Sequence, residues 1–250
     1  MTMLVVAAVL SVLIGVTLGL LGGGGSMLTV PMLIYALHVE PRSAIATSLL
    51  VVGVTSAVGA LAQARSGRVR FRTGLLFGVA GMAGAFIGGR GAHLLPPRVL
   101  LLAFAAMMFA TAVAMLRGRA KVVEPAAHVD VPVARVLVQG AAVGALTGLV
   151  GAGGGFLVVP ALTLLGGLPM TLAVGTSLLV IAMQSLAGFL GYLGYVAIDP
   201  LLAGLVVGAS VVGVLIGGRL AGRVPQPLLR KAFGWFVLAM ALFLVIKQVH

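Results

Sequence analysis

The sequence contains no cysteine and very few acidic residues. Of its 250 residues, none is Cys, 4 are Asp or Glu, and charged residues make up 8%. Without cysteine, disulfide bonds and thiolate chemistry are excluded. No Asp or Glu lies well inside an apolar segment, where proton and sodium relays usually place their carboxylates. The acids lie in or beside loops, at Glu40, Glu124, Asp130 and Asp199.

Histidine is also scarce, and its spacing fits no metal site. The histidines are scattered at His38, His93, His128 and His250. A zinc site needs ligands at short, characteristic spacings, which these positions lack. No hydrolase or metalloenzyme constellation is visible. We therefore expect no enzyme activity, no catalytic residue, no metal and no cofactor.

What the chain has in abundance is apolar sequence. It is 61% hydrophobic with a mean hydropathy of +1.25, and most of it consists of long apolar runs. Runs of about 18 or more apolar residues predict membrane-spanning helices. The sequence thus predicts an all-α polytopic membrane protein that contacts membrane lipid. The N-terminal run has no basic residue before it, and we interpret it as a retained helix rather than a signal peptide.

The net charge of +12 comes from 16 Lys and Arg in short loops between apolar runs. In a membrane protein such loops indicate topology, so nucleic acid is not an expected partner.

The chain is an internal duplication. "GLLGGGGSMLTVPML" recurs as "GLVGAGGGFLVVPAL", so that Pro31 matches Pro160, 129 residues later. The same offset matches "AIATSLLV" to "AVGTSLLV" and "GAFIGGR" to "GVLIGGR". We therefore divide the chain into a first transmembrane repeat (1–116), a polar linker (117–135) and a second transmembrane repeat (136–250).

Each repeat contains five apolar segments, and the second segment of each is short. The segments lie near 3–21, 26–38, 43–64, 73–92, 98–116, 136–150, 155–168, 172–193, 201–221 and 228–246. The segments at 26–38 and 155–168 would cover only about 20 Å of a hydrocarbon core about 30 Å thick. They either cross the membrane with help from unwound chain, or re-enter it as half-helices and leave eight spans.

Loop charge distinguishes these two topologies. If the short segments cross, the repeats are inverted, and 12 of the 16 Lys and Arg lie on one side. If they re-enter, the repeats are parallel and the same residues divide almost evenly. The positive-inside rule favours inverted repeats, with loops 65–72, 117–135 and 219–231 on the cytoplasmic side. We expect the membrane to be the inner (plasma) membrane of the cell.

The duplicated glycine clusters are the strongest candidate for a binding site. A short helix that begins after a glycine break offers free N–H groups and a positive dipole end to an anion. Close helix packing is the alternative explanation for glycine in a membrane protein. The predicted substrate-binding residues here are Gly22, Gly23, Gly24, Gly25, Ser26, Gly151, Gly153, Gly154 and Gly155.

Two further elements are matched between the repeats. Thr47-Ser48 matches Thr176-Ser177 inside apolar helices, where the hydroxyls can bind an oxyanion or bond back to their own helix. Gln184 is a weaker substrate-binding candidate, and Ser56 and Ser185 are weaker still. Arg90 and Arg219 each follow Ile-Gly-Gly and could attract the anion or gate its path, or simply snorkel at a helix end.

On these duplicated motifs the chain resembles the TauE/SafE family of sulfite exporter-like anion permeases, also called the toluene sulfonate uptake permease family. The resemblance covers essentially the whole chain, and its glycine motifs fall on Gly22–Ser26 and Gly151–Gly155. Ala152 stands opposite Gly23, and Gly155 opposite Ser26, so the two half-sites are not equivalent. The resemblance implies transport of a small, often sulfur-containing anion.

We therefore expect a secondary transporter, an exporter of a small anion such as sulfite or an organosulfur anion. The anion would bind at the repeat interface, and rocking of one half against the other would give alternating access. An importer of organic acids or sulfonates and a non-transporting membrane scaffold subunit are the alternatives. A second copy of the chain, giving a homodimer, is a further candidate partner.

Overall fold

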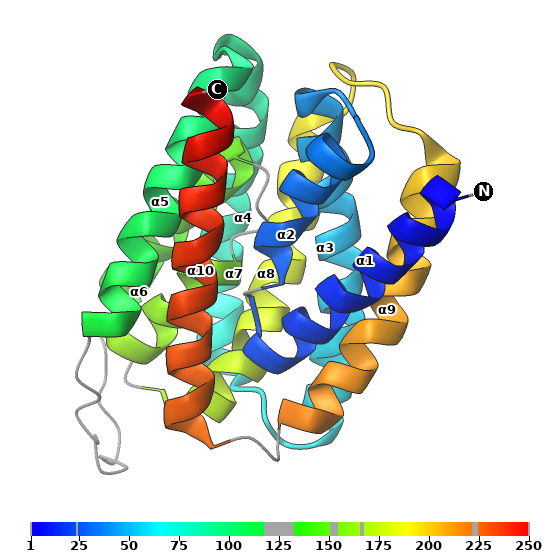
Figure 1. Ribbon diagram of the computed structural model, residues 1–250. Helices are drawn as coiled ribbons and strands as arrows, with labels where there is room; N and C mark the ends of the chain where they lie inside the picture. Colours follow the sequence, from blue (N-terminus) through cyan, green and yellow to red (C-terminus); the bar gives the residue numbers. More distant parts are fainter. Residues whose placement is uncertain are drawn as a thin grey trace.

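The computed structural model describes residues 2–23, 25–117, 133–150, 155–165, 168–221 and 225–249. Within these ranges every regular element is a helix, as the apolar runs predicted (Figure 1). The elements are α1 (Thr2–Leu21), α2 (Ser26–Pro31), η1 (Met32–Ala36), α3 (Pro41–Arg65), α4 (Phe71–Gly91), η2 (Ala92–Leu94), α5 (Pro97–Arg117), α6 (Val133–Val150), α7 (Gly155–Pro160), η3 (Ala161–Leu165), α8 (Met170–Tyr192), α9 (Pro200–Ala221) and α10 (Gln226–Val249).

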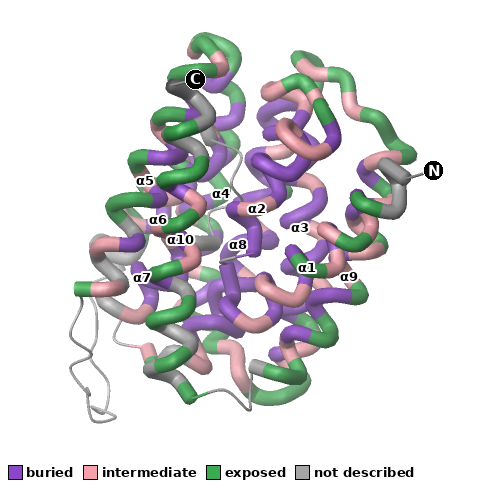
Figure 2. The backbone as a smooth tube through the Cα atoms, in the orientation of Figure 1, coloured by how far each residue is buried: buried purple, intermediate pink, exposed green. Residues whose placement is uncertain are grey.

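Helices α3 and α8 form the centre of the molecule. In each, 72% of the most apolar stretch is buried, against 39% in α4 and 33% in α9. These four are the described helices that are long and apolar enough to cross a membrane. Figure 2 shows buried residues gathered along the central helices and exposed ones on the outer helices. An apolar outer surface suits lipid, and the protein is a multi-pass membrane protein.

The second segment of each repeat is short and changes helix type at its proline. α2 ends at Pro31 and continues as the π-helix η1, and α7 ends at Pro160 and continues as the π-helix η3. Proline has no N–H to donate to the preceding turn, and a wider π turn accommodates that missing bond. The duplicated prolines thus give the same local structure twice.

Glycines allow two pairs of helices to pack at very close range. A Cβ atom at Gly15 of α1 would lie 2.1 Å from the carbonyl oxygen of Ser210 in α9. A Cβ at Gly144 of α6 would lie 2.0 Å from the carbonyl oxygen of Gly81 in α4. These two contacts are equivalent under the 129-residue offset. In both pairs the contacts advance together along the two helices, so α1 runs parallel to α9 and α6 parallel to α4.

The two sequence halves do not form separate bodies. The main packing partners come from opposite repeats: α1 with α9, α6 with α4, α3 with α8 and α5 with α10. Figure 1 shows α1 and α9 side by side, and α10 beside α5. Rocking of one repeat against the other as a rigid unit, the movement expected from the sequence, would have to break all of these contacts.

Helix directions show where the short second segment leads. Along α3 and α8 the contacts run in opposite order, so these equivalent helices are antiparallel: Leu49 with Gly188, Gly53 with Leu186, and Gly59 with Leu178. Because Gly59 also packs on Val214 and Gln63 lies near Gly218, α3 runs parallel to α9 and hence to α1. A re-entrant segment would leave α1 and α3 antiparallel. Instead, α2 and η1 carry the chain back to the end where α1 begins.

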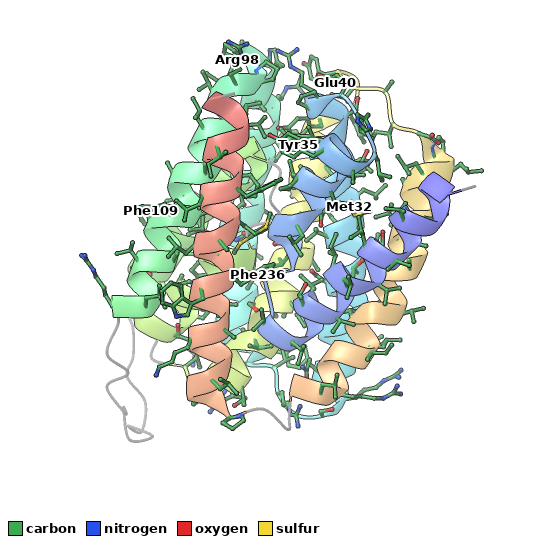
Figure 3. The ribbon with its side chains drawn as sticks, viewed as in Figure 1. Met32, Tyr35, Glu40, Arg98, Phe109 and Phe236 are labelled. Atoms are coloured by element: carbon green, nitrogen blue, oxygen red, sulfur yellow. The ribbon has the colours of Figure 1, made fainter. Side chains whose placement is uncertain are left out.

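Acidic residues cap two of the long helices at the ends of the bundle. The Glu40 carboxylate accepts a hydrogen bond from the Ser43 N–H (3.0 Å) at the start of α3. The Asp199 carboxylate accepts one from the Leu201 N–H (2.9 Å) at the start of α9. A carboxylate at a helix start satisfies free N–H groups and suits the helix dipole. Figure 3 shows Glu40 and Arg98 at the same end of the molecule.

Candidate functional site

The interior contains hydroxyl and amide groups that have no hydrogen-bond partner in the described chain. They are the hydroxyls of Ser48, Thr55 and Ser56 on α3, both amide atoms of Gln184 on α8, and the hydroxyl of Thr29 on α2. All five residues are at most 1% exposed. Burying such a group without a partner costs about 1–3 kcal/mol. Folding stability alone does not explain five such residues, so they are the candidates for contact with a polar ligand.

Three of these residues lie at nearly the same height, where α3 packs on α8. A Cβ at Gly53 would lie 3.4 Å from the backbone nitrogen of Leu186, so the two helices touch at this height. Thr55 and Ser56 therefore lie near the level of Gln184. Thr55 and Gln184 are also equivalent under the 129-residue offset. The repeats thus place matched polar groups at one height of the bundle, and we call this set the central polar cluster (Thr55, Ser56 and Gln184).

The first glycine cluster is a packed turn that contacts the other repeat. Gly22 ends α1 with φ of +71°. A Cβ there would lie 2.8 Å from the Ser177 hydroxyl oxygen and 2.8 Å from Val174 Cα. The Ser26 hydroxyl donates to the Gly23 carbonyl (2.7 Å), so its proton is used within the turn. Gly25 packs on the α1 backbone.

The structure therefore places Gly22 of the first repeat against Ser177 of the second. Gly24 lies outside the described residues, as do Gly151, Gly153 and Gly154 of the second cluster. Gly155 begins α7. The end of α6 before the second cluster is held by the Tyr192 hydroxyl, which donates to the Leu149 carbonyl (2.9 Å).

The two Thr-Ser pairs are buried but differ in their hydrogen bonds. The Ser177 hydroxyl donates to the Val174 carbonyl (2.8 Å), the back-bond that was the alternative to ligand binding. The Thr176 hydroxyl accepts from the Arg70 backbone N–H (3.0 Å). Thr47 is 4% exposed, and the Ser48 hydroxyl has no partner. Ser48 therefore presents a fully buried hydroxyl without a partner.

The structure does not bring the two pairs together. Leu178 packs on Gly59, which lies about 16 Å further along α3 than Ser48 at ~1.5 Å per residue. A single small anion cannot touch both Ser48 and Ser177. The pairs flank the central polar cluster on opposite sides.

The arginines predicted as gates lie at the surface, at opposite ends of the bundle. Arg90 is exposed at the end of α4, and its guanidinium lies 5.9 Å from the ring centroid of Tyr195. Arg219 is exposed at the end of α9. Neither reaches the central polar cluster, and a guanidinium over an aromatic face is a stabilising contact in its own right.

A basic loop beside the first glycine cluster was missed as part of the site. The carbonyl of Arg68 packs on Gly175, and the Arg70 N–H binds Thr176. The α3–α4 loop, with Arg65, Arg68, Arg70 and Arg72, therefore docks on the first turns of α8, next to the contact between Gly22 and Ser177. The sequence indicated only topology for these arginines. Thr29 and Thr55 were also missed as candidate site residues. The 129-residue offset could have identified Thr55, because it matches Thr55 to Gln184.

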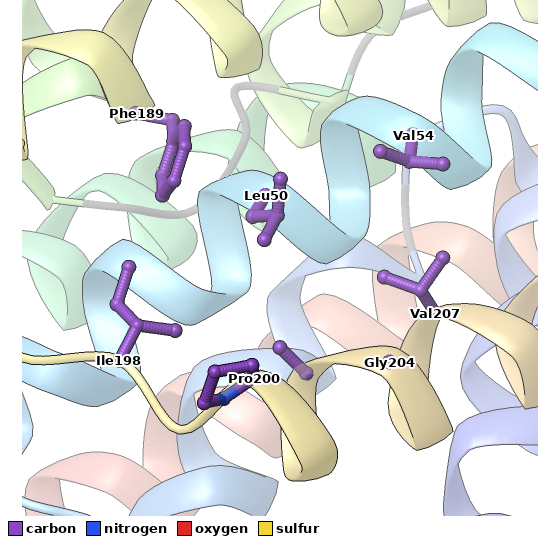
Figure 4. Close-up of a pocket in the computed structure, with 8 residues that line it drawn as sticks. Leu50, Val54, Phe189, Ile198, Pro200, Gly204 and Val207 are labelled. Atoms are coloured by element: carbon purple, nitrogen blue, oxygen red, sulfur yellow. The ribbon is translucent and has the colours of Figure 1, made fainter.

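A pocket of about 390 Å³ lies elsewhere, between α3, the end of α8 and the start of α9 (Figure 4). Its lining is entirely apolar and does not suit an anion: Leu50, Val54, Phe189, Ile198, Pro200, Ala203, Gly204 and Val207. Among the described residues, no group of three or more His, Asp or Glu is placed to hold a metal ion.

These features define an all-helical, multi-pass membrane protein with a neutral polar cluster at its centre. The family model "Sulfite exporter TauE/SafE" matches residues 7–244. A protein of Xylella fastidiosa (strain 9a5c), named "Probable membrane transporter protein", is 36% identical over 240 residues, covering 93% of this chain and 91% of the relative. The Bacillus subtilis (strain 168) protein YdhB, also named a probable membrane transporter protein, is 28% identical over 224 residues, covering 88% and 91%.

The chain therefore belongs to the TauE/SafE family, and it is a membrane transporter rather than an enzyme. The resemblance drawn from the duplicated motifs is confirmed. No solved structure matches this chain.

Proposed function

We propose that the protein is a secondary transporter that exports a small anion, sulfite or an organosulfur anion, across the inner membrane by alternating access. The observation that carries this proposal is the buried, unpartnered set of hydroxyl and amide groups at the crossing of α3 and α8. Neutral donors of this kind can bind an oxyanion in place of its water shell. The printed name of the family supports sulfite as the first anion to test.

The proposal includes inverted repeats, with loops 65–72, 117–135 and 219–231 in the cytoplasm. The antiparallel packing of α3 on α8 and the parallel course of α1 and α3 support it. The placement of 12 of 16 basic residues on one side supports it independently. The arginine loop at 65–72 would then attract anions on the cytoplasmic side, beside Gly22 and Ser177.

The moving units in this proposal are not the sequence halves. Because α1 packs on α9 and α4 on α6, each of these pairs moves as one unit that contains helices of both repeats. The units shift about the central pair α3 and α8, which exposes the central polar cluster to one side at a time. The glycine contacts within each pair favour rigid movement, because backbones in such close contact leave the two helices little freedom to move separately.

The test is binding and transport by purified protein. Sulfite, other sulfur oxyanions and small carboxylates are screened for a shift in thermal stability, and active anions are followed in proteoliposomes. Thr55→Val is expected to weaken binding about tenfold, the value of one hydrogen bond to an anion. Ser11→Ala is the matched control, because its buried hydroxyl donates within its own helix to the Ala7 carbonyl (2.6 Å).

Three results would each contradict part of the proposal. If no anion shifts the stability, the protein is not an anion transporter, and the scaffold alternative gains support. If the anion moves only inward under physiological gradients, the protein is an importer. If Ser11→Ala weakens binding as much as Thr55→Val, the central polar cluster is not the binding site.

A further inference from the structure

Gln184 is the most completely buried amide of the central helices, and it binds nothing in the described chain. It is 0% exposed, and neither Nε2 nor Oε1 has a hydrogen-bond partner. An amide always presents one donor group and one acceptor, whichever way it is turned. Its equivalent in the first repeat, Thr55, is also buried without a partner. The second repeat therefore carries a longer polar group than the first at the same height of the bundle.

Gly81 makes room for this side chain. A Cβ at Gly81 of α4 would lie 1.9 Å from Nε2 of Gln184, 2.6 Å from Cδ and 2.8 Å from Cγ. α4 cannot shift away from it, because Gly81 itself packs on Gly144 of α6. Only glycine at position 81 leaves the amide in its place.

The groups around the amide carry no charge. No Lys, Arg, His, Asp or Glu occurs in α8, between residues 43 and 64 of α3, or between residues 73 and 89 of α4. The hydroxyls of Thr55 and Ser56 can each donate to an anionic oxygen, and so can the amide nitrogen. The amide oxygen can only accept. An anion without a hydrogen-bond donor would leave this oxygen unsatisfied and would repel it.

We propose that Gln184 is a specificity-determining residue whose carbonyl accepts a hydrogen bond from a monoanionic substrate that carries its own donor. The inference rests on the proposed anion-transport function and narrows its substrate class. The donor is an O–H or N–H, either on the oxyanion itself or on a substituent next to it. Gly81 is the positioning residue that keeps the amide in the central polar cluster.

Matched ligand pairs test this inference on the purified, full-length protein. The first pair is 2-hydroxyethanesulfonate and ethanesulfonate, which differ by one hydroxyl. The second is hydrogen sulfite and methanesulfonate in mildly acidic buffer, which places the donor on the oxyanion. The protein is expected to bind the donor-bearing member of at least one pair about tenfold more tightly, as one hydrogen bond allows. The pair that responds identifies where the substrate carries its donor.

Gln184→Leu should reduce this preference to about onefold. It also removes the amide nitrogen as a donor, so both members of a pair should lose the same further affinity, at most about tenfold. Gly81→Ala should have the same effect, because it displaces the amide. Gly78→Ala is the matched control on the same face of α4, since its Cβ would meet the flexible end of Met183, 2.5 Å from Sδ. It should keep the preference.

The outcomes separate this inference from the proposed function. If no anion of either pair binds the parent protein or shifts its stability, both proposals fall. If the parent binds both members of each pair equally, or Gln184→Leu keeps the preference, only the role of Gln184 is overturned. Gln184→Leu should unfold at the same or a higher temperature, because it removes an unpartnered buried amide. If it unfolds earlier, the amide has a structural partner, which also overturns the inference.

Discussion

At the scale of single residues, Gly22 is required for two reasons, its positive φ and its close packing, and comparison with Gly67 separates them. Gly22→Ala places a Cβ at positive φ and 2.8 Å from both Ser177 Oγ and Val174 Cα. Gly67 has nearly the same φ, +69°, with nothing within 4 Å. Gly67→Ala should cost about 1–2 kcal/mol from the backbone alone, and Gly22→Ala about 1–3 kcal/mol more from overpacking. Thermal unfolding of the two variants in detergent measures the difference, and equal losses would show that the turn is not packed on α8.

The hydroxyl of Thr176 anchors the arginine loop and gives a second prediction at this scale. It accepts the Arg70 N–H at 3.0 Å, and its methyl group lies 3.2 Å from the Cβ position of Gly74. Thr176→Val keeps the shape and removes the acceptor, so it should lower stability by about 1–2 kcal/mol. Thr176→Ser keeps the acceptor and should retain most of the stability. Thermal unfolding checks both, and a stable Thr176→Val would show that the loop is held elsewhere.

These residues show what a duplicated sequence can and cannot predict about a site. Repetition picked out Thr176 and Ser177 because the pairs recur at one offset, and it could not show which hydroxyls are already used. That depends on contacts between segments far apart in the chain, such as the Arg70 N–H on Thr176. The residue equivalent to Thr29 in the second repeat is Val158, so the duplication did not mark Thr29 as a candidate. Its lack of a partner emerges only from the packed structure.

At the scale of helices, glycine has two roles that sequence alone does not separate. On α9, a Cβ at Gly213 would lie 2.2 Å from the carbonyl oxygen of Val12 in α1, whereas a Cβ at Gly208 would meet nothing within 4 Å. Gly213→Ala should therefore destabilise the α1–α9 pair by about 1–3 kcal/mol. Gly208→Ala should be neutral, or stabilising by up to about 1 kcal/mol from helix propensity.

The measurement is the unfolding temperature of the two purified variants under the same conditions. Because both changes replace glycine with alanine on one helix, propensity cancels in their difference. A loss for Gly208→Ala as large as for Gly213→Ala would mean that a second chain or a lipid covers that face. A neutral Gly213→Ala would mean that α1 and α9 are packed less closely than described.

The short second segments illustrate what helical periodicity and length do predict. Their length and glycine breaks were evident in the sequence, and α2 with η1 spans roughly 16 Å if every residue rises by 1.5 Å. The π turn after each proline was not predicted, because it arises from how the helix absorbs a missing hydrogen bond. Whether such a segment crosses or re-enters depends on the directions of its neighbours, which only tertiary contacts give.

At the scale of the whole molecule, the interleaving of the repeats is the feature furthest from the sequence. The offset of 129 residues divides the chain cleanly, yet the helices pack mainly on partners from the other half. The apolar character of a repeat does not specify its partner, because most of its residues are equally suited to lipid and to another helix. The glycines that specify the pairing act through shape, which has no signature in composition.

The orientation of the repeats in the membrane gives the final prediction. Ser66 and Tyr195 are equivalent under the offset, lie in equivalent loops and are exposed. If the repeats are inverted, these loops face opposite sides, with Ser66 in the cytoplasm because its loop carries four arginines. The chain contains no cysteine, so Ser66→Cys and Tyr195→Cys each create a single thiol without background. In intact cells an impermeant maleimide should label Tyr195→Cys and spare Ser66→Cys until the membrane is opened. Labelling of both from the same side would instead require parallel repeats with eight spans. Labelling of Ser66→Cys in intact cells would also remove the basis for the cytoplasmic arginine loop as the anion's entrance.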